Sequence, residues 1–251
     1  MSSISNNEIK RIRALQQKKF RDESGLFVVE GEKMVAEAVA SAFSVEQIYR
    51  KEEIGEELMK RISSHSTPSP VLAVVRKPLD IAPDSLGYFD SILCKSGFYI
   101  GLDAIRDPGN LGTIIRIADW FGVDAIFASP DTVDIFNPKT VQSTMGAIFR
   151  VRFHYVSMTD ISKKVLSHGG KVYGTFLDGE NIYRRQLDTG TDTPVMVVVG
   201  NESEGISDNV ASVVSDRLFI PPFPADIRGS ESLNAAVATA ITVAEFRRRT
   251  I

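Results

Sequence analysis

The feature that most constrains this chain is a set of short, uninterrupted apolar runs in its last three-fifths. The runs are Phe98–Leu102, Ala125–Ala128, Val172–Phe176, Val195–Val199 and Leu218–Ile220. They contain few alternating polar residues, as do strands of a parallel sheet that is covered on both faces. Helical patterns separate the runs, so this part of the chain predicts an α/β domain with a mainly parallel sheet. Ligands of such sheets bind at the carboxyl ends of strands, which here precede Asp103, Gly200 and Pro221.

The residues before this domain predict a smaller α/β unit. We expect a polar helix near residues 8–17, an amphipathic helix near residues 32–42, and short strands at residues 26–29, 45–49 and 71–75. Between Lys77 and Gly97 the pattern weakens, and Pro78 and Pro83-Asp84 are turn formers. The domain boundary is therefore predicted near residues 94–98, with residues 1–95 in the first domain and 98–251 in the second.

Composition and the chain's beginning favour a cytoplasmic protein. Of the 251 residues, 43% are apolar and 24% are charged, as in an average soluble protein. The single cysteine, Cys94, excludes an intramolecular disulfide and suits a reducing compartment. Residues 1–13 lack the apolar core of a signal peptide. The richest apolar stretch, Ala235–Phe246, is too short to span a bilayer, so no membrane contact is expected.

The charge is unevenly distributed. The net charge of −3 argues against a protein coated with basic residues. Between residues 10 and 21, however, there are six basic residues and no acidic one: Lys10, Arg11, Arg13, Lys18, Lys19 and Arg21. This cluster predicts either contacts with nucleic-acid phosphates or a solvated helix face, and charge alone leaves both open.

The first polar segment at a strand end runs from Asp103 to Arg116. Asp107-Pro108-Gly109-Asn110 is typical of a turn, and an amphipathic helix is expected after it. Arg116 lies off the apolar stripe of that helix, so it can reach toward the strand ends. The alternative is a surface arginine that contacts Asp119 or Trp120 one turn later.

Two further segments follow later strands. Gly200 and Glu202 come directly after an apolar strand, where glycine would let a ligand approach the backbone and the carboxylate could bind an amine or hydroxyl. The alternative is an ordinary strand-to-helix turn, because the lysine of a phosphate-binding loop is absent. The third segment comprises Ile220-Pro221 and Ser232-Leu233-Asn234, in which Ser232 could also be a helix N-cap.

In this order, the three segments resemble motifs 1, 2 and 3 of the SpoU (TrmH-type) methyltransferases of the SPOUT superfamily. The motif residues are Asn110 to Arg116, Gly200-Asn201-Glu202 to Gly205, and Ile220-Pro221 with Ser232-Leu233-Asn234. Asn137–Thr140 and Met145–Arg150 also resemble a stretch of these enzymes, and the similarity covers residues 98–251. Residues 23–31 resemble a ribosomal-protein-like substrate-binding domain. The loop Pro222–Arg228 is longer than the family's usual link, so the resemblance does not give the shape of the cofactor pocket's rim.

The resemblance implies an S-adenosylmethionine-dependent enzyme that methylates a ribose 2′-hydroxyl of rRNA or tRNA, without a metal. It also implies a C-terminal trefoil knot and a homodimer. The implied catalytic residues are Asn110, Arg116, Glu202, Ser232 and Asn234. The implied cofactor-binding residues are Val199, Gly200, Asn201, Glu202, Gly205, Ile220, Pro221, Ser232 and Leu233.

Two rival functions remain open at this point. One is a noncatalytic RNA-binding protein that retains the fold, and the other is a related enzyme that methylates RNA bases. Intact motif residues count against the first, and the Asn110 and Ser232-Leu233-Asn234 patterns favour ribose over base. Arg116 is either a base or a phosphate clamp, and the clamp is favoured because a guanidinium keeps its proton at neutral pH. We interpret the three histidines, which lie outside the motifs, as structural. The sequence leaves open which RNA is the substrate.

Overall fold

The computed structural model describes residues 4–82, 86–93, 96–224 and 232–250. Cys94, the predicted turn at Pro83-Asp84 and Ala225–Arg228 of the long loop lie outside the described residues. The chain forms two compact units. Unit 1 contains the chain up to Leu79 and Asp134–Arg150, and unit 2 contains Asp80–Val133 and the chain from Val151 onward. This division differs from two consecutive segments because Asp134–Arg150 packs with the N-terminal residues.

Unit 1 is built on an antiparallel sheet in the order β1-β3-β2. Its strands are β1 (Leu26–Glu30), β2 (Val45–Arg50) and β3 (Val71–Arg76). Its helices are α1 (Asn6–Ala14), α2 (Lys18–Ser24), α3 (Glu32–Ala40), α4 (Lys51–Ile54), α5 (Glu56–Ile62) and α7 (Pro138–Thr144), and a 3₁₀ turn covers Ala147–Phe149. Ile12, Met59 and Leu72 belong to its buried core. The predicted elements of this unit are present, with ends that differ by a few residues.

Unit 2 contains a six-stranded sheet in the order β6-β5-β4-β8-β7-β9, and every pairing in it is parallel. The strands are β4 (Gly97–Leu102), β5 (Ala125–Ala128), β6 (Phe153–Tyr155), β7 (Lys171–Asn181), β8 (Pro194–Val199) and β9 (Asp216–Phe219). The predicted parallel sheet is therefore confirmed. From β4 the chain adds β5 and β6 on one side, and the later strands lie on the other side, so the strand order reverses between β4 and β8.

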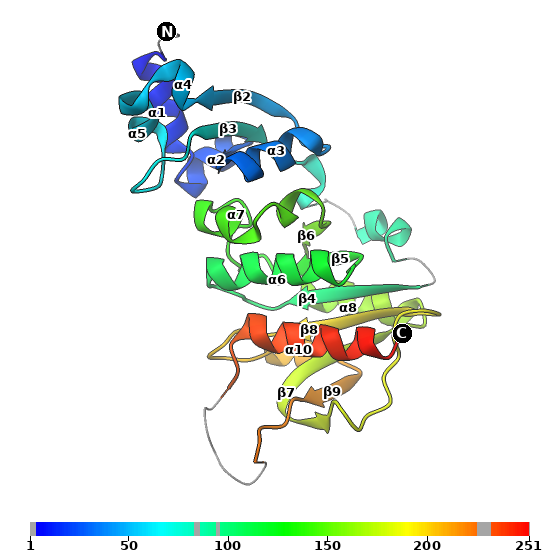
Figure 1. Ribbon diagram of the computed structural model, residues 1–251. Helices are drawn as coiled ribbons and strands as arrows, with labels where there is room; N and C mark the ends of the chain where they lie inside the picture. The colour runs from blue at the N-terminus through cyan, green and yellow to red at the C-terminus, as the bar shows by residue number, and fades with distance from the viewer. Residues whose placement is uncertain (1–3, 83–85, 94–95, 225–231, 251) are drawn as a thin grey trace. The chain divides into compact units, whose positions relative to one another are not determined.

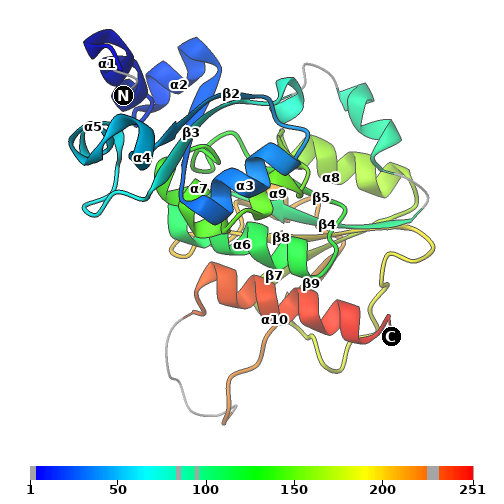
Figure 2. The ribbon, with the colours of Figure 1, turned by 45° about the horizontal axis from the view of Figure 1, so that its top comes forward.

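Helices cover both faces of this sheet. Helices α6 (Pro108–Trp120) and α10 (Ala235–Arg248) lie side by side on one face, and α8 (Met158–Ser167) lies on the other, as Figures 1 and 2 show. The short α9 (Asp208–Ala211) packs beside α8. Met196 and Val198 of β8 pack in the cluster that contains Ile161 and Val165 of α8. Side chains on either face of the sheet thus meet apolar side chains of a helix layer, which explains why the strand sequences are apolar without interruption. None of the described helices is long and apolar enough to cross a membrane.

The last helix is only partly buried in the single chain. Val243 and Phe246 are fully buried, whereas Val237 is 47% exposed, and Leu233, just before the helix, is 46% exposed. One side of this helix is therefore exposed in the single chain. The helix begins at Ala235, and its N-cap is Asn234 rather than Ser232, because the side chain of Asn234 accepts hydrogen bonds from the N–H groups of Ala236 and Val237.

His154 lies on β6, a three-residue strand too short and polar for the sequence pattern to indicate. Its ring is 2% exposed and packs against the rings of Tyr88, Phe89 and Phe127. Nδ1 lies 2.7 Å from the carbonyl oxygen of Asp80, and buried Nε2 has no hydrogen-bond partner. Burial lowers the pKa of His154 below its ordinary value of 6.5, and nearby Arg152 acts in the same direction.

We predict that this histidine makes the protein less stable in mild acid. Because the folded-state pKa is depressed, the stabilisation is complete above pH 6.5 and is lost as the pH falls toward the folded-state pKa. One such group changes the free energy of unfolding by at most about 1.4 kcal/mol per pH unit. Urea unfolding of wild type and His154→Phe between pH 7.5 and 5.5 measures this effect. The variant should lose less stability on acidification, and equal losses would contradict the assignment.

Candidate functional site

The carboxyl ends of β4 and β8 lie next to each other where the strand order reverses. Leu102 pairs with Val199, and the N–H of Asp103 donates to the carbonyl of Val199 at 3.0 Å. Open parallel sheets bind ligands at such a reversal. The first two polar segments predicted from the sequence therefore meet at one edge of the sheet.

The turn after β8 is closed by its own backbone. Asn201 and Gly205 exchange two backbone hydrogen bonds, of 3.0 and 2.9 Å. A Cβ atom on Gly200 would lie 2.2 Å from the carbonyl carbon of Gly205. The turn itself therefore fills the space at the Cβ position of Gly200, and the approach of a ligand to the Gly200 backbone stays a prediction. Gly205 has a φ of +73°, which also favours glycine.

Asn201 ties this turn to the loop after β4. Its Nδ2 donates to the carbonyl of Ala104 at 2.9 Å, and its Oδ1 accepts from the N–H groups of Ser203 and Glu204. Ala104 adopts a φ of +56°, and its N–H donates to the hydroxyl of Ser129. The side chain of Asn201 thus holds the two loops together, and both of its backbone groups bond to Gly205, so its predicted contact with the cofactor stays a prediction.

Asp103 is a structural residue of the site that sequence reasoning did not single out. Its side chain is 6% exposed and accepts the N–H of Ser207 at 2.7 Å, which fixes the chain beyond the 200–205 turn. The signal was available in the sequence, since an acidic residue directly follows a buried strand.

Helix α6 positions the first segment. It begins at Pro108, and the side chain of Asp107 accepts the N–H of Asn110 at 2.8 Å as its N-cap. The predicted Asp-Pro-Gly-Asn turn is therefore the first turn of the helix. Leu111 and Ile115 are fully buried, which fixes the orientation of the helix on the sheet.

The side chain of Asn110 joins all three segments. Its Nδ2 donates to a carboxylate oxygen of Glu202, and its Oδ1 accepts from Nδ2 of Asn234 at 2.9 Å. Since Asn234 also caps α10, the starts of both outer helices are linked to the turn after β8. The second carboxylate oxygen of Glu202 accepts no hydrogen bond from a described residue, so it is available to a ligand.

Arg116 lies on the exposed face of α6, with Trp120 one turn later. Within the described part of the chain its guanidinium makes no ion pair or hydrogen bond, so the alternative pairing with Asp119 is not formed. Arg106, in the loop before the helix, pairs instead with Glu204 at 3.3 Å. Arg116 is therefore a solvated cation on the helix that carries Asn110.

The third segment is only partly assembled at this edge. Ser232 and Leu233 are exposed and immediately precede Asn234, and Ser232 does not cap α10. Ile220 and Pro221 follow the edge strand β9, and no described contact joins their side chains to Asn110 or Glu202.

Backbone donors remain open in the second and third segments. In the described residues, the N–H groups of Gly200, Ile220 and Leu233 donate no hydrogen bond to the protein, so they can bind a ligand. The search of the same residues found no group of three or more His, Cys, Asp or Glu side chains that could hold a metal ion.

The basic cluster in unit 1 divides into two kinds of residue. Arg21 is 2% exposed and bonds to Asp134 and to two backbone carbonyls, so neither alternative for the cluster, a phosphate contact or a solvated helix face, holds for this residue. Lys18 pairs with Asp22 on the surface, a contact of small net energy. Lys10 and Arg13 are exposed on α1 and have no ion pair among the described residues.

Comparison with known proteins gives matches over both parts of the chain. The family model of the SpoU rRNA Methylase family matches residues 97–244, and that of the MRM3-like substrate binding domain matches residues 6–59. The 23S rRNA (guanosine(2553)-2′-O)-methyltransferase RlmP of Bacillus subtilis is 29% identical over 98% of this chain and 98% of its own length.

Two solved structures match nearly the whole chain. One, from Porphyromonas gingivalis, is described as belonging to the TrmH family; it is 35% identical with a TM-score of 0.84, and the match covers 99% of this chain and 100% of that one. The other is an AdoMet-bound rRNA methyltransferase from Sinorhizobium meliloti. It is 29% identical with a TM-score of 0.86, over 100% of this chain and 98% of that one.

We predict that the turn after β8 tolerates no side chain at Gly200. Gly200→Ala should lower the free energy of unfolding by about 1–3 kcal/mol through overpacking and speed hydrogen exchange at the Gly205 N–H. The matched control is Gly205→Ala, whose Cβ would meet no atom within 4 Å and which carries only the strain of its positive φ, about 1–2 kcal/mol. Urea unfolding and amide exchange of both variants measure the difference. Fast exchange in Gly205→Ala with wild-type behaviour in Gly200→Ala would refute this account of the turn.

Proposed function

The chain belongs to the SpoU rRNA methylase family, and on this premise we propose that it transfers a methyl group from S-adenosylmethionine to a ribose 2′-hydroxyl of RNA. The name of the Bacillus relative supports the 2′-oxygen as acceptor, and the Sinorhizobium structure supports the cofactor. In this chain, the proposal rests on the hydrogen-bonded group Glu202–Asn110–Asn234, with Arg116 free on the same helix as Asn110.

The residues at the strand ends fit a cofactor of this kind. S-adenosylmethionine supplies an electrophilic methyl group on a positively charged sulfur when it is bound. The free N–H groups of Gly200, Ile220 and Leu233 are donors for its polar atoms, and the free oxygen of Glu202 can accept from an amine or hydroxyl. Backbone N–H donors together with a carboxylate acceptor suit the polar groups of an organic cofactor.

Arg116 acts on the RNA in this proposal. A guanidinium keeps its proton at neutral pH and is therefore a poor base, but it binds a phosphate through paired donors. Placed beside the acceptor ribose, its charge also stabilises the oxygen as the hydroxyl loses its proton. We therefore assign Arg116 to phosphate binding and to electrostatic activation of the hydroxyl.

Asn110, Glu202 and Asn234 orient the reacting groups. Asn110 uses both ends of its amide within the group, so it fixes the Glu202 carboxylate and the start of α10 at once. In-line methyl transfer needs this fixed placement, and positioning of this kind lowers barriers by about 7–11 kcal/mol in ideal intramolecular reactions. Ser232, exposed beside Leu233, is available to the ribose or cofactor.

In unit 1, Lys10 and Arg13 are the proposed contacts with RNA phosphates. Both cations are exposed on α1, within the residues that match the substrate-binding family model. Phosphate contacts by such residues add affinity and position the RNA without reading its sequence.

Replacement of Arg116 tests the proposed chemistry. Arg116→Ala should lose methyl transfer at least about a hundredfold while cofactor affinity is kept. Arg116→Lys should not restore activity, since a point charge does not replace a planar fork of donors. Labelled methyl transfer to ribosomal RNA, with calorimetric titration of the cofactor, measures both quantities.

A surface cation elsewhere in unit 2 provides the matched control for this test. Lys163→Ala removes an exposed charge from α8, on the opposite face of the sheet, and should leave transfer unchanged. Near-normal transfer by Arg116→Ala would remove this residue from the mechanism. Cofactor binding by the wild type without transfer to RNA would favour the noncatalytic RNA-binding function.

The functional form in our proposal is a homodimer. Trp120 is 85% exposed and Val237 is 47% exposed, on the two helices that cover one face of the sheet. Apolar side chains on adjacent helices are typical of a subunit interface, and a second copy of the chain would bury them by symmetry. Because Arg116 is exposed on α6 with Trp120, the second copy would also border the acceptor site.

A charge on this helix layer tests the dimer. Val237→Glu should reduce the mass measured by light scattering at micromolar concentration from that of a dimer to that of one 27.6 kDa chain, because the buried carboxylate would have no partner. Lys163→Glu, on the opposite helix layer, is the control and should remain dimeric. A monomeric wild type, or a Val237→Glu variant that stays dimeric with an unchanged dissociation constant, would contradict this interface.

A further inference from the structure

One segment of the chain leaves the sheet of unit 2 and becomes part of unit 1. It connects β5 to β6, and Asp134–Arg150 of this connection packs in unit 1. There, the ring of Phe136 packs at a tilt against the ring of Phe27 with centroids 4.7 Å apart, and α7 contacts β1. At its far end, Arg150 pairs with Glu37 of α3. The segment is therefore held in unit 1 along its length, while both of its ends continue into the sheet of unit 2.

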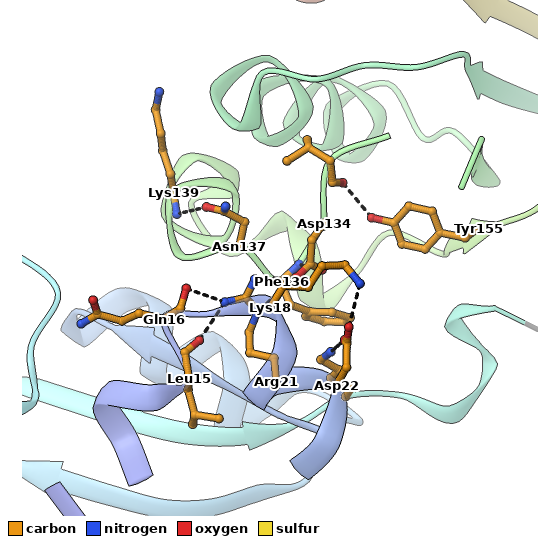
Figure 3. A network of polar contacts seen from close by, with 12 residues as sticks. Leu15, Gln16, Lys18, Arg21, Asp22, Asp134, Phe136, Asn137, Lys139 and Tyr155 are labelled. Atoms are coloured by element: carbon orange, nitrogen blue, oxygen red, sulfur yellow. Dashed lines mark hydrogen bonds and ion pairs between the residues drawn. The ribbon is translucent and has the colours of Figure 1, made fainter. Parts of the chain in front are cut away.

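The first residue of this segment forms a buried ion pair. Nε and Nη2 of Arg21 donate to Oδ2 of Asp134 at 3.1 and 2.6 Å, and Oδ1 of Asp134 accepts the N–H of Phe136 at 2.9 Å (Figure 3). The exposed fractions of the two side chains are 2% for Arg21 and 9% for Asp134. Every oxygen of the carboxylate is thus engaged away from water.

Arg21 also binds the end of α1. Its Nη1 donates to the carbonyls of Leu15 and Gln16, both at 2.8 Å (Figure 3). Leu15 is the C-cap of α1, where free carbonyls and the helix dipole favour a cation. The guanidinium therefore joins α1, α2 and Asp134 in one rigid arrangement.

The residue before Asp134 is fixed to the loop of the first motif. The N–H of Val133 donates to the carbonyl of Ile105 at 2.8 Å, and its carbonyl accepts the hydroxyl of Tyr155 at 2.8 Å. Ile105 lies in the loop between β4 and α6, the helix that carries Asn110 and Arg116. One peptide bond thus separates a residue bound to the helices of unit 1 from a residue bound to the loop of the reactive segment.

We propose that Arg21 and Asp134 are positioning residues for methyl transfer: their ion pair fixes the 133–134 peptide, and through Val133 it fixes the loop that sets α6. This inference rests on the proposed function. Relative to apolar residues of similar size, a buried ion pair adds little net stability, so stability alone does not account for it. The ion pair instead fixes a geometry, because the hydrogen bonds of the guanidinium define the position of the Asp134 carboxylate.

The test replaces the pair with apolar residues and separates kcat from binding. In Arg21→Met/Asp134→Leu neither buried charge is left alone, so the fold should be kept. We expect kcat per cofactor-binding site to fall at least tenfold, while cofactor affinity and RNA affinity change less than twofold. Hydrogen exchange at the Val133 N–H should become at least tenfold faster. A merely structural role would move neither kcat per bound cofactor nor this one amide selectively.

Tyr49→Phe is the matched control. It removes the 2.5 Å hydrogen bond from the buried Tyr49 hydroxyl to Glu8 in the same unit, without touching residues 133 and 134. Below the unfolding temperature its kcat should equal that of wild type. If the double variant does not fold, Arg21→Lys keeps the charge but loses the planar fork, and it should lower kcat in the same way.

The outcomes separate this inference from the proposed function. A wild type that methylates RNA, with a double variant of unchanged kcat per bound cofactor, would overturn the positioning role alone. Equal losses of kcat in Tyr49→Phe and the double variant would also overturn it, since stability of unit 1 would then explain the effect. A wild type that binds cofactor but methylates no RNA would overturn the proposed function and this inference together.

Discussion

The side-chain amide of Asn110 is the interaction on which the candidate site depends. It contacts Glu202, 92 residues away, and Asn234, 124 residues away. An amide has one donor and one acceptor end, so using both fixes its orientation. Asn110 can hold this position because Leu111 and Ile115 bury α6 on a sheet that is covered on both faces. The packed parallel sheet thereby holds the three polar segments in a fixed geometry. Methyl transfer between two bound molecules requires such a geometry.

Much of the fold could be predicted because strands buried on both faces leave a strong local signal. Val195–Val199 is apolar at every position since both of its faces meet helices. By contrast, β6 has three residues and includes His154, so it carries no such signal. The packing of Asp134–Arg150 in unit 1 was also beyond prediction. Periodicity indicates a helix after Asn137, but it does not say which sheet the helix contacts, and Arg21 bonds to a residue 113 positions away.

At the candidate site, the sequence indicated which residues take part more reliably than it indicated which atoms each of them contacts. Glu202 directly follows a strand, whereas Asn110 and Asn234 are implied by the family resemblance, and the structure brings these three together. Gly200 signals a close approach, but the approaching atoms belong to Gly205 rather than to a ligand. Similarly, a run of basic residues does not show that Arg21 is buried. Backbone conformation and burial depend on distant residues, so neither can be derived from a local pattern.

The account's central claim is that the methyl group reaches a ribose oxygen, and the most direct test identifies the methylated atom. RNA from cells that lack this protein would be incubated with the protein and isotopically labelled S-adenosylmethionine, digested with nuclease, and analysed by mass spectrometry. The account predicts label in the sugar of a single nucleoside, with the phosphodiester bond that follows it resistant to alkali because the 2′-oxygen is blocked. Label on a base, or the absence of any labelled nucleoside despite cofactor binding, would contradict it.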